Sequence, residues 1–156
     1  MKPVTTLHDT VVVKRTLEAS AARVFAAWRD TAALQRWHVP GEGAWRSKLL
    51  SHDFRVGGGR LMTFGAPGDV QYKEDCRYED IVDDQRICYA MTISRDDARI
   101  TTSLVTVELA ARGNGTVLTV TDQIAILDGG DTAADRERGW GETLDKLPAE
   151  LARRAA

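Results

Sequence analysis

Apolar and polar residues alternate along several stretches of the chain, as they do in strands that bury one face. The first stretch is Leu7–Leu17, whose β-branched run Val11-Val12-Val13 favours extended backbone. The same pattern predicts further strands at Trp45–Phe54, Arg60–Phe64, Val70–Val82, Arg86–Arg95, Ile100–Ala110 and Thr116–Leu127. Short turn sequences at Asp83-Asp84 and Gly113-Asn114-Gly115 predict antiparallel hairpins.

Two short helices are predicted after the first strand. Ser20 is a suitable N-cap for the first helix, because its hydroxyl can accept a backbone N–H. An apolar stripe at helical spacing follows it, made of Ala21, Val24, Phe25 and Trp28. Asp30 and Thr31 then indicate a break and a new cap, before a second short helix at about Ala32–Arg36.

The end of the chain returns to the helical period. Trp140, Leu144, Leu147 and Leu151 recur at steps of four, three and four, which is one face of a helix. Pro148 falls inside this pattern, where it removes a backbone hydrogen bond. We expect either a kink at Pro148 or a restarted helix that holds Pro148 in its first turn.

Together these elements predict an α+β fold. Each hairpin strand has an apolar row, and such rows need an apolar cover. The Trp140 helix is the long amphipathic element available to supply it. We therefore expect residues 1–156 to form one domain, with a curved antiparallel sheet of about six to seven strands wrapped around a long C-terminal helix.

Charge and composition narrow the classes of partner. The formal net charge is −2 and there is no Lys/Arg cluster, which argues against nucleic acid and against an anionic membrane surface. The chain begins with a polar segment, and no run approaches the length of a membrane span. With two cysteines in all, we expect a reducing cytoplasm. A homodimer is compatible with these features.

Six segments in order resemble one bacterial protein family. They are Val24-Phe25…Trp28…Leu34…Trp37…Pro40-Gly41, Asp53-Phe54-Arg55-Val56-Gly57-Gly58, Cys76-Arg77-Tyr78-Glu79-Asp80-Ile81, Gly115-Thr116-Val117-Leu118-Thr119, Asp122-Gln123 and Gly139-Trp140…Leu144…Leu147. This pattern resembles the SRPBCC (START/birch-allergen-like) proteins of the heat-shock-protein-ninety ATPase activator homologue type. The resemblance implies a helix-grip fold with a cavity between the sheet and the last helix.

The strand at Val70–Val82 presents a mixed aromatic and acidic face that suits a ligand pocket with a few polar anchors. The alternative is that this face points to solvent. With the facing rows of the other strands and the helix, the predicted cavity residues are Tyr72, Glu74, Tyr78, Tyr89, Met91, Val105, Val120, Trp140 and Leu144.

Three carboxylates are candidates for acid or base chemistry: Glu74, Asp80 and Asp122. Asp122 shares the parity of its apolar neighbours Val120 and Ile124. A carboxylate there needs partners or a raised pKa. A β-bulge near Asp122-Gln123 that turns it outward is the interpretation we favour.

Other reactive residues favour structural roles. The histidines His8, His38 and His52 are scattered, so we expect no metal site, and no cofactor motif is present. Cys76 and Cys88 fall about three residues out of opposition in their hairpin, so we expect no disulfide and no catalytic thiolate.

Gly57-Gly58-Gly59 lacks the Lys-Ser/Thr of a phosphate loop and predicts a tight turn. Trp28, Trp37 and Trp140 are expected in the core, and the place of Trp45 is open.

Three functions remain. The first is non-covalent binding of a small hydrophobic molecule, as a sensor, carrier or scavenger. The second is a cavity enzyme of the cyclase, hydrolase or lyase type, although the chain shows no recognisable catalytic set. The third is a chaperone-ATPase cofactor, as the family name implies. We rank it last, because we expect the chain to hold only the domain related to the activator's C-terminal part.

Overall fold

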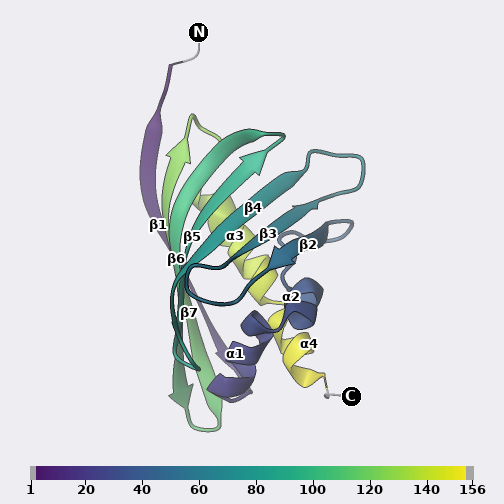
Figure 1. The fold of residues 1–156 in the computed structure, drawn as a ribbon, viewed down its shortest axis with the longest axis vertical. Helices are drawn as coiled ribbons and strands as arrows, with labels where there is room; N and C mark the ends of the chain where they lie inside the picture. Colours follow the sequence, from purple (N-terminus) through teal and green to yellow (C-terminus); the bar gives the residue numbers. More distant parts are fainter. Residues whose placement is uncertain (1–2, 154–156) are drawn as a thin grey trace.

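Seven antiparallel strands form one curved sheet in the structure, a computed structural model that describes residues 3–153 (Figure 1). The strands are β1 (Thr6–Leu17), β2 (Arg46–His52), β3 (Gly59–Gly65), β4 (Tyr72–Val82), β5 (Arg86–Arg95), β6 (Ala98–Arg112) and β7 (Gly115–Leu127). Their order in the sheet is β1-β7-β6-β5-β4-β3-β2. All neighbours but β1 and β7 follow one another in sequence, so the predicted meander is confirmed.

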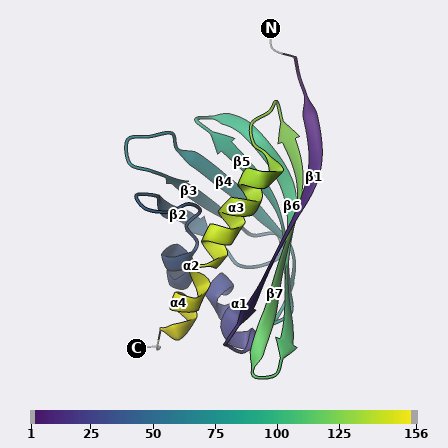
Figure 2. The same ribbon diagram turned by 180° about the vertical axis from the view of Figure 1, so that it is seen from behind.

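Within residues 3–153, four helices lie on the concave side of the sheet. They are α1 (Ala21–Arg29), α2 (Thr31–Trp37), α3 (Ala133–Leu144) and α4 (Leu147–Ala152). Figure 2 shows α3 crossing the concave face, with α1, α2 and α4 gathered at its lower end. This is the predicted α+β, helix-grip arrangement. None of the helices within residues 3–153 is both long enough and apolar enough to span a bilayer.

Local sequence explains where the helices begin. The Ser20 hydroxyl accepts the Arg23 backbone N–H at 3.1 Å, and Thr132 does the same for Asp135 at 3.1 Å. Each cap satisfies one of the backbone donors that a helix leaves free in its first turn. Asp30 occupies the N-cap of α2 without a side-chain cap.

The expected long C-terminal helix is two helices. α3 ends at Leu144 and α4 starts at Leu147, with Pro148 in its first turn. A proline there loses no hydrogen bond, since first-turn N–H groups have no partner inside a helix. Of the two predicted outcomes at Pro148, the restart is therefore the correct one.

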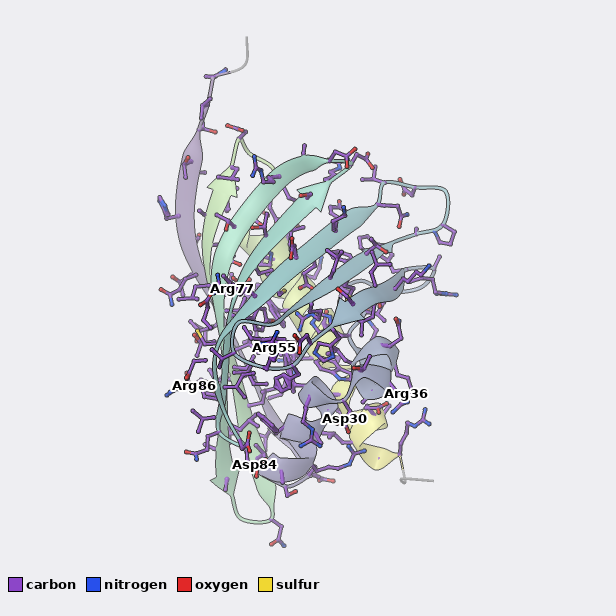
Figure 3. All side chains as sticks on the ribbon, in the orientation of Figure 1. Asp30, Arg36, Arg55, Arg77, Asp84 and Arg86 are labelled. Atoms are coloured by element: carbon purple, nitrogen blue, oxygen red, sulfur yellow. The ribbon has the colours of Figure 1, made fainter. Side chains whose placement is uncertain are left out.

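Side chains tie the helical end of the molecule together. Arg36 on α2, which is labelled in Figure 3, donates to both carboxylate oxygens of the buried Glu150 on α4, with Nε 3.0 Å from Oε2. Lys146, between α3 and α4, donates from Nζ to the backbone oxygens of Val39 and Gly41. The segment that follows α2 is thus fastened to the α3–α4 junction.

The core fills the space between the sheet and the helices. Trp28 and Trp37 are both 1% exposed and pack edge to face, with ring centroids 4.9 Å apart. Trp140 on α3 is 6% exposed and lies 6.5 Å from the Trp28 ring. The prediction of core tryptophans is confirmed for all three. Buried residues of every strand except β2 complete the core.

Candidate ligand cavity

A cavity of about 680 Å³ lies between the concave face of the sheet and α3. Its walls come from the α2–β2 segment, from β3 to β6, from the β7–α3 connection and from α3. Figure 2 shows these elements around the upper half of α3, above the end closed by α1 and α2. The helix therefore forms one wall and the sheet the opposite one.

Three aromatic rings line the side of the cavity next to the α2–β2 segment. Phe64 and Tyr72 are cross-strand partners on β3 and β4, with centroids 5.3 Å apart and an interplanar angle of 11°. Trp45 stacks on Tyr72 at 5.7 Å and 21°. Gly41 allows this placement, because a Cβ at that position would lie 2.5 Å from the Trp45 ring. The three rings form a stacked aromatic cluster on this side of the cavity.

Two charged residues are buried at the inner end of the cavity. Glu74, which lines the cavity, is 3% exposed, and its neighbour Arg60 is 2% exposed. Arg60 Nη2 lies 3.4 Å from Glu74 Oε2, which is an ion-pair distance without hydrogen-bond geometry. Within the described part of the chain, Glu74 Oε2 has no hydrogen-bond partner. The two opposite charges of this buried pair balance each other.

His38 is another buried polar residue that lines the cavity. It is 2% exposed, and its ring packs against Trp37, Trp28 and Trp140 with centroids 5.1, 6.1 and 6.2 Å away. Neither ring nitrogen has a hydrogen-bond partner among residues 3–153. Burial lowers the pKa of His38 to about 4, against a smaller raising effect of Glu74. His38 is therefore neutral at physiological pH.

A row of polar side chains leads from Arg60 toward α2. Arg60 Nη1 lies 3.4 Å from the Tyr78 hydroxyl, which lies 2.9 Å from His52 Nε2. His52 Nδ1 in turn lies 3.1 Å from the Thr31 hydroxyl on α2. Burial raises the pKa of Tyr78 despite the lowering effect of Arg60, so Tyr78 remains a neutral phenol. These contacts give hydrogen-bond partners to Tyr78 and His52, which lie outside the cavity lining.

Asp122 points into the core from β7, and the expected β-bulge is wrong. Residue 122 pairs with Val11 on β1 and Val105 on β6, without a register shift near it. The side chain is 0% exposed. Its Oδ2 accepts from Arg136 Nη1 at 2.8 Å and from Trp140 Nε1 at 2.9 Å. The ion pair with Arg136 and the two hydrogen bonds stabilise the buried carboxylate of Asp122, for which the sequence pattern had indicated no partner.

Arg136 links this cluster to the cavity wall. Its Nη2 donates to the Thr101 hydroxyl at 2.6 Å, and its Nε donates to Asp131 at 3.2 Å. Both Arg136 and Asp131 line the cavity, whereas Asp122 lies behind them. The cluster fixes α3 on the sheet and so sets the width of the cavity.

The cavity contains four of the predicted lining residues: Tyr72, Glu74, Met91 and Trp140. The other five, Tyr78, Tyr89, Val105, Val120 and Leu144, are buried but belong to the solid core around it. These five residues face inward, as predicted, but neighbouring side chains fill the space around them. The cavity is thus shorter than expected and lies nearer the β7–α3 connection.

Asp80 lies away from the cavity. A register shift between Tyr78 and Asp80 is the bulge of this part of the sheet, and it turns Asp80 off the inner face. Asp80 Oδ2 accepts from Arg86 Nε at 2.7 Å, and Figure 3 shows Arg86 on the side of the sheet away from the helices. The structure therefore removes Asp80 as a cavity acid.

The cysteines and histidines form no reactive cluster in the described chain. Cys76 is opposite Met91 and Cys88 is opposite Asp80, which confirms the predicted offset, and both thiols are free. Burial raises the pKa of the Cys76 thiol, which disfavours its thiolate. No group of three or more His, Cys, Asp or Glu that could hold a metal ion is found within residues 3–153.

Sequence reasoning missed three polar residues of this region: His38, Arg60 and Arg136. Arg60 carried a usable signal, because it has the parity of Met62 and Phe64 on a strand whose inner face is otherwise apolar. Arg136 lies one helical turn before Trp140, on the face that docks onto the sheet. His38 directly follows the buried Trp37 and carried no periodic signal.

Comparison with known proteins places the fold in a family. The family described as "Activator of Hsp90 ATPase homolog 1-like protein" matches residues 18–152. Among curated proteins no match is found.

Solved bacterial structures are similar over nearly the whole chain. The Mll3558 protein from Rhizobium loti is 41% identical with a TM-score of 0.84, covering 94% of this chain and 99% of its own. An uncharacterized protein from Rhizobium leguminosarum is 34% identical with a TM-score of 0.87, covering 97% and 99%. An AHSA1-like protein from Aeromonas hydrophila, at 20% identity and a TM-score of 0.72 over 95% and 99%, shares the fold. The chain therefore belongs to the Activator of Hsp90 ATPase homolog 1-like family of the SRPBCC superfamily.

Proposed function

We propose that the protein binds a small, largely apolar molecule in the cavity between its sheet and α3, as a sensor, carrier or scavenger. The observation that carries this proposal is a cavity of about 680 Å³ at that place, whose sheet side includes apolar side chains of β3 to β6 and whose α3 side includes several charged residues. Its volume lies within the range of about 300–1,000 Å³ that is usual for ligand sites.

The lining indicates how such a molecule would lie. Met91, Ile93 and Ile100 supply aliphatic contacts from β5 and β6, opposite Trp140 on α3. Burying one large apolar group contributes about 1.5–3 kcal/mol, so two such groups contribute about 3–6 kcal/mol. Micromolar binding needs about 8 kcal/mol, so the polar part of the ligand must also be hydrogen-bonded.

Native mass spectrometry of freshly purified protein tests this proposal first. A retained molecule would appear as a mass that is lost on denaturation. A thermal-shift screen with a panel of apolar molecules is the second arm, because a ligand of the folded state alone raises the unfolding midpoint. Absence of both a retained mass and any shift would overturn a binding role.

The enzyme alternative now depends on Glu74 alone. Asp80 is outside the cavity, and Oδ2 of Asp122 is held by Arg136 and Trp140. Glu74 is buried beside Arg60, whose Nη2 lies 3.4 Å from Glu74 Oε2 in an ion pair. Binding therefore remains the better supported function.

A further inference from the structure

β1 forms one edge of the sheet, and among residues 3–153 only β7 pairs with it. Figures 1 and 2 both show the upper part of β1 as the outermost element on its side of the molecule. All twelve residues from Thr6 to Leu17 pair with β7 without a register shift. A long, regular edge strand of this kind offers a row of free backbone groups to another strand.

The opposite edge of the sheet is protected in ways that are usual for edge strands. β2 has seven residues and a register shift between Leu49 and Ser51. It also carries the exposed side chains of Arg46 and Lys48. A short strand, a bulge and positive charges all discourage pairing with another chain. β1 has no bulge, and Val12 near its centre is 48% exposed, so β1 is the edge suited to a partner strand.

Two local hydrogen bonds show which backbone groups of β1 point away from β7. The Thr10 N–H donates to Asp9 Oδ1 at 2.8 Å, and the Lys14 carbonyl accepts from Arg15 Nη1 at 2.9 Å. The Thr5 carbonyl, in the odd-numbered set, instead accepts from the residue just after β7. Successive residues of an antiparallel strand direct their backbone groups to opposite sides. The even-numbered residues of β1 therefore face the free edge.

The charges of this edge are complementary to those of a second copy. Asp9 and Arg15 are equally far from Val12 in the sequence and have the same strand parity. If two β1 strands pair antiparallel about a two-fold axis at Val12, each carboxylate of Asp9 lies opposite an Arg15 guanidinium of the other copy. Thr10 then lies opposite Lys14, so backbone groups of the two free edges meet. Any other axis separates these opposite charges.

Each bond that a side chain now makes to its own edge has a counterpart in this arrangement. The Thr10 N–H would exchange Asp9 for the Lys14 carbonyl of the other copy. Arg15 would exchange that carbonyl for the carboxylate of Asp9, and opposite charges directly across an antiparallel pair favour the pairing. We infer that two copies of this protein associate through β1, about a two-fold axis at Val12, and join their sheets into one.

Sedimentation velocity over a concentration series of the unaltered chain tests the association. A dimer should form as the concentration rises, and a monomer at every concentration would overturn the inference. Thr10→Pro then tests the edge, because proline is tolerated where the N–H of an edge strand faces outward. The variant loses an N–H that would bond across the axis in each copy. It should weaken the dimer at least about tenfold, with urea unfolding close to that of the unaltered chain.

A charge exchange tests the register. Asp9→Arg and Arg15→Asp each place like charges opposite one another in a homodimer, so each variant alone should associate at least about tenfold more weakly. Mixed together, the two variants restore opposite charges at both positions, and a heterodimer should form about as tightly as the unaltered dimer. Asp145→Asn is the control, because it removes the partly exposed ion pair of Arg15 within one copy and leaves the edge unchanged. It should not alter association.

A dimer that keeps its affinity in Thr10→Pro and in Asp9→Arg would use another surface, and this result would overturn the β1 interface. A mixture of the two charge variants that stays monomeric would overturn the axis at Val12. Arg15 also donates to the backbone of Gly141 on α3, so Arg15→Asp is the variant most at risk of not folding. In that case Thr10→Pro and Asp9→Arg still decide, since both must weaken the dimer.

Discussion

The indole Nε1 of Trp140 donates to Oδ2 of Asp122 across 2.9 Å, and this bond joins the middle of α3 to β7, the strand next to the edge strand β1. Arg136 Nη1 reaches the same oxygen at 2.8 Å. One carboxylate thus holds two positions of the helix, and the helix is one wall of the cavity.

Asp122→Asn should destabilise the protein strongly. The amide keeps a carbonyl acceptor but removes the charge opposite the buried Arg136, and breaking a buried ion pair costs about 3–5 kcal/mol. Urea unfolding would measure the loss. Asp135→Asn is the control, because the Asp135–Arg138 pair is exposed on the same helix and such pairs contribute about 0–1 kcal/mol. Similar losses in the two variants would contradict the role given to Asp122.

Acid should weaken the fold through His38. Its folded pKa of about 4 lies below the value of about 6.5 for an unfolded histidine, so the unfolded chain binds one more proton between these limits. The stability that neutral His38 contributes is complete above pH 6.5 and is lost as the pH falls toward 4. The slope is about 1.4 kcal/mol per pH unit, or about 3 kcal/mol over the window.

Urea unfolding from pH 4.5 to 7.5 would check this, with His38→Gln as the comparison. Other groups that titrate are shared by both chains, so the difference between the two profiles isolates His38. Its charged neighbours are Glu74, Arg60 and Lys146. Parallel profiles over the whole range would mean that His38 takes up its proton in the folded state as readily as in the unfolded one.

Gly59→Ala should damage the sheet. A Cβ at Gly59 would lie 2.2 Å from the backbone oxygen of Cys76, so β3 and β4 would have to separate locally. We expect a loss of at least about 2 kcal/mol, as for other changes that force a backbone shift. Gly139→Ala on α3 is the opposite case, because nothing lies within 4 Å of its Cβ. It should gain about 0.5–1 kcal/mol of stability, and chemical denaturation would measure both signs.

Gly139→Phe should close the cavity without unfolding the protein. Gly139 lines the cavity and lies in a helix with open space at its Cβ, so a phenyl group there would occupy the ligand's place. Glu137→Phe adds the same ring to the exposed side of the same helix. Any ligand found by the thermal-shift screen should lose its effect on the first variant and keep it on the second. An equal effect on both would move the binding site elsewhere.

The strands and the first helices could be predicted from the sequence because their signals are local. Alternation over Arg86–Arg95 and the Ser20 cap depend on residues within a few positions of each other. The register of Cys76 and Cys88 followed from the short turn between their strands. Boundaries moved by a few residues, as at β2, where the strand starts at Arg46 and ends at His52.

The polar part of the site could not be predicted in the same way. Asp122 was expected to turn outward because its partners, Arg136 and Trp140, are 14 and 18 residues away on another element. An unpaired buried carboxylate is costly, so a bulge was the reasonable inference without them. The bulge occurs instead beside Asp80, where the ion pair with Arg86 is exposed.

The two hydrogen bonds from Lys146 have a consequence for how a molecule enters. They fasten Val39 and Gly41 to the α3–α4 junction, and the segment they belong to carries His38 and Trp45, which both line the cavity. Because of these two hydrogen bonds, an outward movement of α3 would carry the segment after α2 with it. The distance between α3 and this segment would then stay the same. Widening the cavity between α3 and this segment therefore requires the Lys146 ammonium group to release both carbonyls.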